Sequence, residues 1–215
     1  AECETFLTAD FRLMLECPGK IVDGLRAVMR ALNVKRGVIA IEDNKPEAIE
    51  TMRKAASGRE GVEIAVMRTK YPQGGEKQLI KAVTGREVPS GKLPIEVHTI
   101  VMNVGTAAAV ADAVIDGRPL IDRITTVTGC VQRPANLRLR IGTIIGDVIG
   151  ECGGFSEEPG KIVFGGGMTG LCVPDTDVPM TKANNGIVVY NVKDARSVDE
   201  SPCIRCGRCV EACPI

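Results

Sequence analysis

RGVIAIEDNKPEAIETMRKAASGREGVEIAVMRT, residues 36–69, contains two short apolar runs separated by a segment with helical periodicity. The runs RGVIAIED (36–43) and VEIAVMRT (62–69) have the length and composition of buried strands. Asn44 is the expected N-cap of the helix between them. Its apolar residues recur at helical spacing, at Ala48, Ile49, Met52 and Ala56. This strand–helix–strand unit predicts a mostly parallel sheet covered on both faces.

The same alternation continues on both sides of this unit. Residues 18–33 and 105–117 have the spacing of helices, and residues 74–85 predict a loop that runs into a helix. The apolar run VHTIVMNV, residues 97–104, predicts a further strand. The first half of the chain therefore predicts an α/β domain.

The pattern changes near Arg118. Three strands and one helix are expected beyond it, at residues 120–129, 136–142 and 161–166 and at residues 144–154. Thr143 is the expected N-cap of this helix. Residues 184–190 predict a turn entering a strand, and residues 191–202 form a polar linker. The strands and helix predict a compact α+β unit.

Composition limits the possible functions. Lys plus Arg number 27 and Asp plus Glu number 27, so the balanced charge argues against a nucleic-acid surface. Aromatic residues make up 3%, which argues against stacking platforms for single strands. No apolar run reaches the length of a membrane span. The cysteines outside the C-terminal run are scattered and odd in number, which fits a reducing cytosol better than a disulfide framework.

The C-terminal sequence SPCIRCGRCVEACPI places four cysteines in a regular pattern. Cys203, Cys206, Cys209 and Cys213, followed by Pro214, form C-x₂-C-x₂-C-x₃-C-P, the ferredoxin run that ligates [4Fe–4S] clusters. In two-cluster ferredoxins the fourth cysteine of such a run binds the other cluster. The first three cysteines are therefore expected to bind one cluster, and Cys213 a second.

Two other interpretations of these cysteines fit less well. A disulfide pair needs no such register, and a zinc site usually splits its cysteines into two separated pairs. The sequence contains no second cysteine run and starts at Ala1 without a Met. We therefore expect a piece of a longer protein that is cut at both ends.

Three further motifs are weaker. GGGMTG (165–170) matches G-x-G-x-x-G, but the prolines after it exclude the helix that a dinucleotide site requires, so a tight turn is expected. GREVPSGK (85–92) fails as a P-loop because its glycines are too far apart. His98, the only histidine, has no identifiable catalytic partner and is expected to be structural. The turn YPQGGEKQ (71–78) precedes a helix whose N-terminus could receive a phosphate.

Several stretches together resemble the C subunit of the Rnf electron-transport complex, and they occur in the family order over nearly the whole chain. YPQGGEKQLI and CIRCGRCVEACP are the most specific. The family is similar to the flavin-carrying, NADH-oxidising subunit of respiratory complex I. The matching stretches are AECETFLTADFRLMLE, IEDNKPEAI, YPQGGEKQLIKAVTGREVPSGKLP, NVGTAAAVADAVIDGRPLIDR, NLRLRIGT and CIRCGRCVEACP.

The resemblance implies a fold class and a division of the chain. The fold class is an α/β Rossmann-like flavin/NADH domain plus a small α+β β-grasp (SLBB) domain and the start of a ferredoxin-like iron–sulfur domain. The flavin/NADH domain is expected at 1–117 and the SLBB domain at 118–170. A return segment and linker are expected at 171–200, and the first half of the ferredoxin domain at 201–215.

The resemblance also implies an activity. The full-length protein is expected to pass electrons between ferredoxin and NAD(H) through FMN and two [4Fe–4S] clusters, coupled to ion transport. Its expected partners are the other Rnf subunits, NAD(H) and, indirectly, ferredoxin, without nucleic acid. Its expected location is peripheral, on the cytoplasmic face of the cell membrane.

The residues that match the cofactor-binding stretches of the family fall into three groups. An acidic pair borders flavin and nucleotide, a glycine-rich turn forms part of the flavin pocket, and a loop and helix start hold the flavin phosphate or ribityl chain. The expected residues are, in that order, Glu2 and Glu4; Tyr71, Gly74, Gly75 and Glu76; and Asn103, Val104, Gly105 and Thr106.

The sequence departs from the family pattern at several points. Thr5 stands where the family usually has Pro, and GGGMTG replaces the usual GGPMMG. The glycine-rich loop that binds flavin and NADH in the family would lie before Ala1. Two alternatives stay open: a corrinoid reductase of related domain plan, and a docking module in which the β-grasp unit binds a partner without chemistry.

Overall fold

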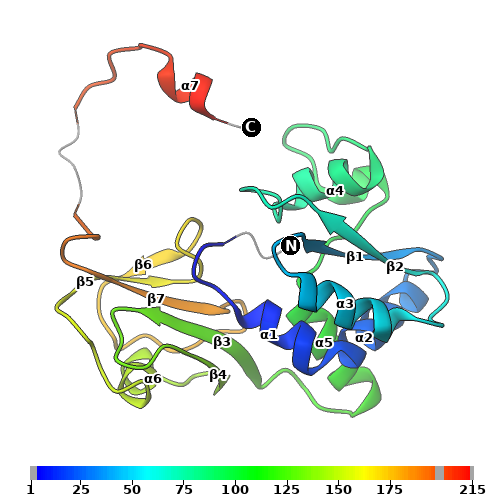
Figure 1. Cartoon of the computed structure of the whole chain (residues 1–215), viewed down its shortest axis with the longest axis horizontal. Coiled ribbons are helices and arrows are strands. Elements are labelled where there is room, and N and C mark those ends of the chain that lie inside the picture. Colours follow the sequence, from blue (N-terminus) through cyan, green and yellow to red (C-terminus); the bar gives the residue numbers. More distant parts are fainter. Residues whose placement is uncertain (1–3, 197–200, 214–215) are drawn as a thin grey trace.

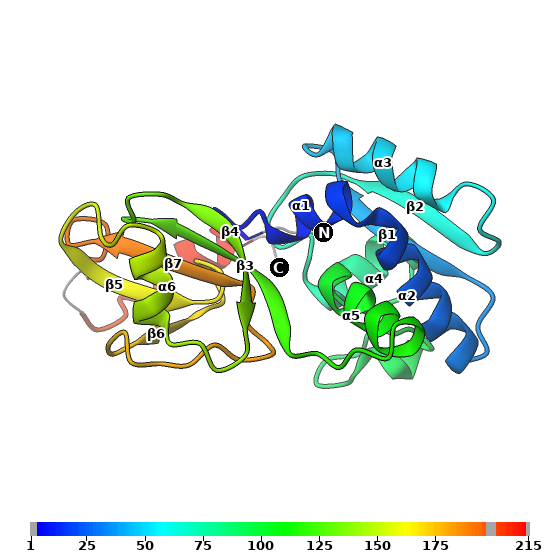
Figure 2. The ribbon, with the colours of Figure 1, turned by 90° about the horizontal axis from the view of Figure 1, so that it is seen from below.

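The chain is described here by a computed structural model that covers residues 4–196 and 201–213. Figure 1 and Figure 2 show two lobes and a separate C-terminal segment. The first lobe is an α/β unit that runs from α1 (Ala9–Glu16) to α5 (Val104–Ile115). The second lobe is built on a larger sheet. Within the described ranges, no helix is long and apolar enough to cross a membrane.

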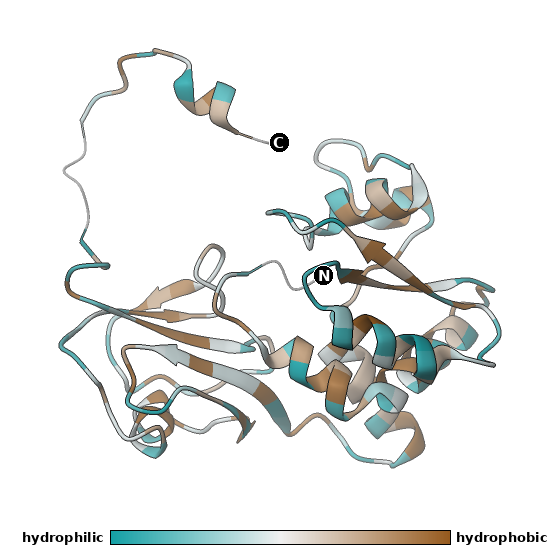
Figure 3. Cartoon of the chain, in the orientation of Figure 1, coloured by the Kyte–Doolittle hydropathy of each residue, from teal (hydrophilic) through white to brown (hydrophobic). Residues whose placement is uncertain are grey.

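The sheet of the first lobe confirms the predicted strand–helix–strand unit. Strands β1 (Gly37–Glu42) and β2 (Val62–Met67) are parallel, and α3 (Pro46–Ala56) connects them. The buried face of α3 consists of the predicted apolar residues. Figure 3 shows hydrophobic residues along much of both strands, as expected for a covered parallel sheet.

The predicted N-cap of α3 is wrong. Lys45, and not Asn44, is the N-cap residue, and its side chain makes no capping hydrogen bond. Asn44 instead donates its backbone N–H to Thr69 Oγ1 at 3.2 Å. A tertiary contact with the loop after β2 therefore takes the place of the local cap.

Besides α1 and α3, the first lobe contains the helices α2, α4 and α5. α2 (Pro18–Ala31) and α5 pack together, and both confirm the predicted helices. α4 (Glu76–Thr84) follows the glycine-rich turn as predicted and ends at Gly85, whose φ of 75° suits a glycine. The core of the lobe joins α1, α2, β1, α3 and α5 through buried side chains that include Met14, Ile21, Val22, Ile39, Ile41 and Met52.

The strand predicted at residues 97–104 is wrong. A short 3₁₀ helix, η1 (Pro94–Val97), ends at His98, which has a φ of 52°. Residues 99–103 follow without regular structure, and α5 begins at Val104. An apolar run becomes a strand only beside a partner strand, and β1 and β2 pair only with each other among the described residues.

The second lobe is a five-stranded sheet with the order β4-β3-β7-β5-β6. α6 (Ile145–Glu151) contributes Ile145, Val148 and Ile149 to its core. Two of the strands, β3 and β7, are parallel, and the other neighbours are antiparallel. The strands are β3 (Asp122–Gly129), β4 (Ala135–Arg140), β5 (Pro159–Phe164), β6 (Leu171–Val173) and β7 (Gly186–Asn191).

Strand β7 occupies the centre of this sheet, so the sheet uses residues on both sides of the expected boundary at residue 170. The predicted cap at Thr143 is wrong, because Ile144 is the N-cap residue of α6. Ile144 forms a β-bridge with Pro179, and the carbonyl oxygen of Thr143 accepts the N–H of Met180 at 2.8 Å. Pairing with the segment before β7 therefore fixes the start of α6.

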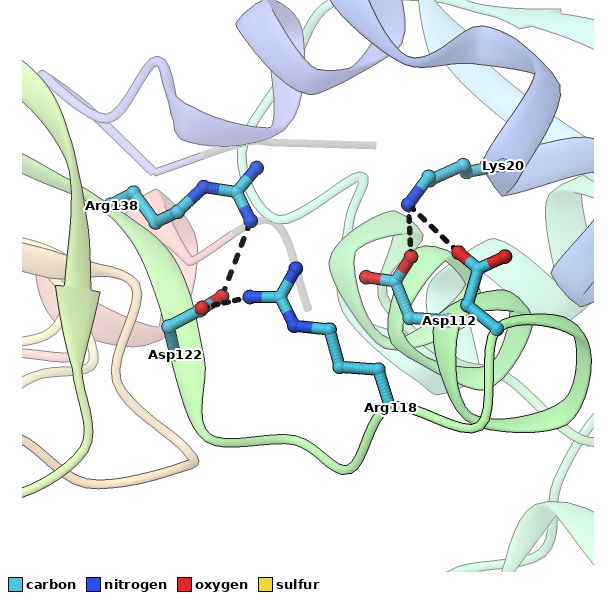
Figure 4. Close-up of polar contacts among 6 residues, drawn as sticks. Lys20, Asp112, Arg118, Asp122 and Arg138 are labelled. Carbon is cyan, nitrogen blue, oxygen red and sulfur yellow. Dashed lines mark hydrogen bonds and ion pairs between the residues drawn. The ribbon is translucent and has the colours of Figure 1, made fainter.

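The junction of the lobes carries polar contacts on several elements. Thr126 Oγ1 of β3 accepts the N–H groups of Thr8 and Ala9, at 3.1 and 3.0 Å, where α1 begins. Figure 4 shows two ion-pair groups on either side of the connection from α5 to β3. Lys20 contacts Asp112 and Asp116, and Asp122 contacts Arg118 and Arg138.

The C-terminal segment carries the cysteines. Its single described helix, α7 (Arg208–Ala212), starts after Gly207, whose φ is 78°. Figure 1 shows this segment extending away from both lobes. None of its described residues belongs to the hydrophobic cores of the two lobes.

Candidate functional site

The carboxyl ends of β1 and β2 lie at the same edge of the parallel sheet, where α/β folds commonly bind ligands. Asp43, directly after β1, accepts hydrogen bonds from the N–H and the hydroxyl of Thr69, at 3.0 and 2.5 Å. These hydrogen bonds lower the pKa of the Asp43 carboxyl. They hold together the two loops that leave the sheet at this edge.

A cavity of about 810 Å³ begins at this edge and runs along β1. Three of the expected cofactor residues, Gly74, Asn103 and Val104, line it. Most of its remaining wall is apolar and comes from α2, α4 and β1. The structure therefore brings the glycine-rich turn and the start of α5 to one site, although 28 residues separate Gly75 from Asn103.

Glu42 is a buried acid in the wall of this cavity, at the end of β1. Its side chain is 2% exposed, and its Oε2 lies 3.6 Å from Lys45 Nζ. Its Oε1 is buried and has no hydrogen-bond partner within the described part of the chain. Because an unsatisfied buried acceptor is costly, Glu42 Oε1 marks a place where a ligand N–H or O–H fits.

The start of α5 offers donors on the other side of the same edge. Asn103 is the N-cap, and its Oδ1 accepts the N–H of Gly105 at 2.7 Å. Its Nδ2 donates to Asp10 Oδ2. Burial raises the pKa of Asp10, although the hydrogen bond from Asn103 and the charge of Arg123 act in the opposite direction. The helix therefore presents an oriented N-terminus, the position that favours a phosphate.

The glycine-rich turn packs tightly before α4. Gly75 is the N-cap with a φ of −60°, and a Cβ built on it would lie 2.7 Å from Gln78 Oε1 and 3.0 Å from the carbonyl oxygen of Pro72. Tyr71 and Glu76 are exposed at its two ends. Gln73 in this turn was not predicted as a site residue; it is 4% exposed, and its Nε2 has no partner among the described residues. A lone polar residue in a turn carries no sequence signal of burial.

Glu4 does not line this cavity. Its carboxylate accepts the N–H of Met168 at 2.9 Å and the hydroxyl of Thr169 at 2.5 Å. A Cβ on Gly166 would lie 2.3 Å from Glu4 Cδ, so this glycine permits the close approach. Glu4 therefore binds the turn between β5 and β6. Glu2 lies outside the described residues.

The four cysteines of the C-terminal run are exposed free thiols. The backbone N–H of Arg205 points to Cys203 Sγ at 3.4 Å, and the N–H of Cys213 donates to the carbonyl oxygen of Cys209 at 3.1 Å. The described residues contain no group of three or more His, Cys, Asp or Glu arranged to hold a metal ion. Pro214 lies outside the described residues. The run therefore supplies the ligand types without gathering them into one site.

Comparison with known domain families decides the family. Residues 1–112, more than half of the 215, match the Nuo51 FMN-binding domain. The chain belongs to this family. Residues 124–171 match the SLBB domain, and residues 196–215 match the 4Fe-4S binding domain. The expected fold class is confirmed.

Curated relatives confirm the resemblance to the C subunit of the Rnf complex. The chain is 51% identical over its whole length to the C subunit of the proton-translocating ferredoxin:NAD(+) oxidoreductase complex of Clostridium ljungdahlii, covering 47% of that protein. It is 48% identical to the C subunit of the Na(+)-translocating complex of Acetobacterium woodii, covering 49% of it. It is 46% identical to the C subunit of the ion-translocating oxidoreductase complex of Rhodobacter capsulatus, covering 42%. The chain spans about half the length of these relatives.

Solved structures with the same fold include an NAD+-reducing [NiFe]-hydrogenase in two states. The H2-reduced state gives a TM-score of 0.71 at 20% identity, covering 88% of this chain and 39% of that one. The air-oxidized state gives 0.68 at 21% identity, with the same coverage. At this identity the match shows the arrangement of the fold alone.

Proposed function

We propose that the full-length protein is the electron-transfer subunit of a membrane-associated Rnf complex. It passes electrons between ferredoxin and NAD(H) by way of FMN and [4Fe–4S] clusters, coupled to ion transport. The observation that carries this proposal is the cavity along β1, which reaches Glu42 at the carboxyl end of that strand and lies within the residues that match the FMN-binding domain. The names of the relatives support ferredoxin and NAD+ as reactants, with ion translocation. A peripheral position on the cytoplasmic face is part of the proposal.

The residues at this edge fit FMN. The cavity of about 810 Å³ is in the range typical of cofactor sites. FMN combines a phosphate, a hydroxylated chain and a flat apolar ring, and the edge offers a partner for each part. The N-terminus of α5 suits the phosphate, the buried Glu42 Oε1 suits a hydroxyl or a ring N–H, and the apolar wall suits the ring.

Each residue group has a separate role in this proposal. The start of α5 holds the phosphate or ribityl chain through the backbone N–H groups of Asn103, Val104 and Thr106, while the N–H of Gly105 donates to Asn103 Oδ1 and keeps the helix start in place. Gly74 and Gly75 allow the backbone of the turn to approach the flavin closely. Tyr71 and Glu76 form its exposed rim, and Glu2 remains a candidate on the nucleotide side. Glu4 acts indirectly, by fixing the β5–β6 turn.

When FMN is bound, it supplies the step between two-electron transfer with NAD(H) and one-electron transfer with the clusters. The protein contributes position and environment. Asn103 orients α5 through its hydrogen bonds to Gly105 and Asp10. The apolar wall excludes water from the cavity, and Glu42 offers a fixed acceptor at one end.

The cysteines take the cluster role in the same proposal. Cys203, Cys206 and Cys209 hold one [4Fe–4S] cluster, and Cys213 ligates a second whose other ligands lie outside this sequence. The chemistry of the donor set fits, because all four are free thiols on an exposed segment. Gly207 turns the backbone between the second and third ligands with its φ of 78°.

Substitution of Asn103 in the full-length protein tests the flavin site. Asn103→Ala removes the cap of α5 and should lower FMN occupancy, because caps contribute about 1 kcal/mol and the phosphate donors lose their orientation. Asn103→Ser retains an acceptor at the N-cap and should restore occupancy in part. The readouts are FMN per protein and NADH-dependent dye reduction. Full occupancy in the alanine variant would reject the site.

A further inference from the structure

A chain of polar contacts connects the second lobe with the start of α5 in the first lobe. Asn103 donates its Nδ2 to Asp10 Oδ2 of α1 at 2.5 Å, and its Oδ1 accepts the N–H of Gly105 at 2.7 Å. Arg123 of β3 donates from Nη1 to the carbonyl oxygen of Lys182 at 2.5 Å, and its charge acts on the Asp10 carboxyl. The second lobe therefore reaches the cap of α5 by way of Asp10.

Arg123 lies behind Asp10 when the site is viewed from the large cavity. Asp10 lines both the large cavity and a smaller one of about 80 Å³ at the junction of the lobes, whereas Arg123 lines only the smaller one. A Cβ built on Gly105 would lie 3.7 Å from Arg123 Nη2, so the guanidinium reaches the first turn of α5. Any effect of Arg123 on a ligand in the large cavity therefore passes through Asp10 and the helix start.

The second lobe also fixes the position of Asp10. Thr126 Oγ1 accepts the N–H groups of Thr8 and Ala9, which directly precede Asp10. Thr126 and Arg123 belong to the same strand, β3, three positions apart. The backbone of α1 is thus bound at its start to the strand whose guanidinium faces the Asp10 carboxyl.

The charge on Asp10 decides which end of the Asn103 amide faces the helix. An ionised carboxylate can only accept hydrogen bonds, so Asn103 must present its Nδ2 to it and its Oδ1 to the N–H of Gly105. A protonated carboxyl can also donate, and either end of the amide then fits. Burial raises the pKa of Asp10, whereas the hydrogen bond from Asn103 and the charges of Arg123 and Lys45 lower it. The guanidinium of Arg123 therefore favours the form that fixes the cap.

We propose that Arg123 is a positioning residue of the flavin site, which acts through Asp10 to fix the orientation of Asn103 and the start of α5. The inference rests on the proposed function, because it takes the phosphate or ribityl chain of FMN to bind at this helix start. Among the described residues, none of those that line the large cavity comes from the second lobe. The second lobe thereby contributes to cofactor affinity without contacting the cofactor.

Titration of the full-length apoprotein with FMN, followed by the quenching of flavin fluorescence, tests the proposal. Arg123→Gln removes the charge and should weaken FMN binding by about tenfold, within the range of couplings between contacting residues. Arg123→Lys retains the charge and should bind FMN within about threefold of the wild type. Wild-type affinity in Arg123→Gln, or equal losses in the two variants, would overturn the proposal.

A second arginine of the same small cavity provides the matched control. Arg138 of β4 contacts Asp122 at 3.3 Å, as Figure 4 shows, and not Asp10. Because it is a partly exposed ion pair outside the chain of contacts, Arg138→Gln should keep the FMN affinity within about twofold of the wild type. A loss as large as that in Arg123→Gln would contradict a specific role of Arg123.

A double variant separates action through Asp10 from an independent effect. Asp10→Asn should itself weaken FMN binding, because a neutral amide no longer dictates the orientation of Asn103. In this background Arg123→Gln should add at most about a twofold loss, since its route to Asn103 is already removed. Losses that multiply in the double variant would exclude the proposed route.

Amide exchange of Gly105 in the apoprotein measures the positioning without flavin. Its N–H donates to Asn103, so it should exchange about tenfold faster in Arg123→Gln and at the wild-type rate in Arg138→Gln. An unchanged rate in folded Arg123→Gln would refute the proposal. A wild-type protein that binds no FMN would instead reject the proposed function, while the exchange of Gly105 still decides whether Arg123 fixes the helix start.

Discussion

The two sheets of the molecule differ in what surrounds their most buried strand. In the second lobe, β7 lies between β3 and β5 and both of its edges are paired. In the first lobe, β1 pairs with β2 on one edge and faces a cavity of about 810 Å³ on the other. The second lobe fills its core with its own side chains and with Leu7 of the N-terminal segment, whereas the first lobe leaves a cavity beside β1.

The largest effect on stability is expected in the centre of the second sheet. Ile187 on β7 is 0% exposed, so Ile187→Ala should lower the free energy of unfolding by about 2–5 kcal/mol. Ile100→Ala, on the half-exposed wall of the cavity, is the matched control within the first lobe and should cost clearly less. Urea unfolding measures both variants. Equal losses of unfolding free energy in the two variants would contradict the difference between a filled core in the second lobe and an open one in the first.

The cysteine segment should behave independently of both lobes. Cys206→Ala in the full-length protein should remove one [4Fe–4S] cluster, roughly half of the iron bound by a two-cluster domain, and leave the flavin in place. Cys172→Ala is a suitable control because Cys172 is an exposed thiol outside the run. Iron and sulfide analysis gives the result, and an unchanged content would exclude Cys206 as a ligand.

A substitution in the glycine-rich turn should affect the first lobe alone. Gly75→Val should weaken flavin binding by about tenfold or more, because its side chain would crowd Gln78 and the Pro72 carbonyl, and overpacking costs about 1–3 kcal/mol. Gly19→Ala, where a Cβ meets nothing within 4 Å, is the control. Flavin titration measures the loss. Normal affinity in the valine variant would make the turn purely structural.

The smallest expected effect is a dependence of the free energy of unfolding on pH. Burial raises the pKa of Asp10 in the folded protein above its ordinary 3.8, so the folded state binds this proton more tightly than the unfolded state. The free energy of unfolding should therefore fall as the pH rises from about 4 through the raised pKa, by at most about 1.4 kcal/mol per pH unit. Asp10→Asn should remove this fall, whereas Glu16→Gln at the exposed end of α1 should keep it. Parallel pH profiles for the wild type and Asp10→Asn would contradict the assignment.

The sequence predicts the parts of the fold that depend on local periodicity. The β1–α3–β2 unit, α2, α4 and α5 follow from apolar spacing, and the cysteine run follows from a spacing that few other sites share. The same reasoning failed where a distant segment decides the outcome. Asn44 and Thr143 do not cap their helices, and their own backbone groups instead pair with Thr69 and Met180.

The sequence likewise pointed to only some of the residues at the candidate site. Gly74, Asn103 and Val104 line the cavity, since the residues after parallel strands and at helix starts meet at one edge, and their role at a flavin stays a prediction. Glu42 and Gln73 were not predicted, because burial of a lone polar side chain depends on packing and leaves no local pattern. The contacts of Glu4 with Met168 and Thr169 join residues 164 and 165 positions apart, and no local pattern predicts them.

Anaerobic reduction of the full-length protein by NADH tests the central claim most directly, because it requires a flavin in the first lobe and clusters on the C-terminal segment together. The account predicts that bound FMN bleaches on addition of NADH and that the electron paramagnetic resonance signal of reduced [4Fe–4S] clusters follows. It also predicts that Asn103→Ala weakens both responses in proportion to its lower FMN occupancy, whereas Cys206→Ala retains the bleaching. Full-length protein that binds no flavin, or whose flavin stays oxidised in the presence of NADH, would contradict the account.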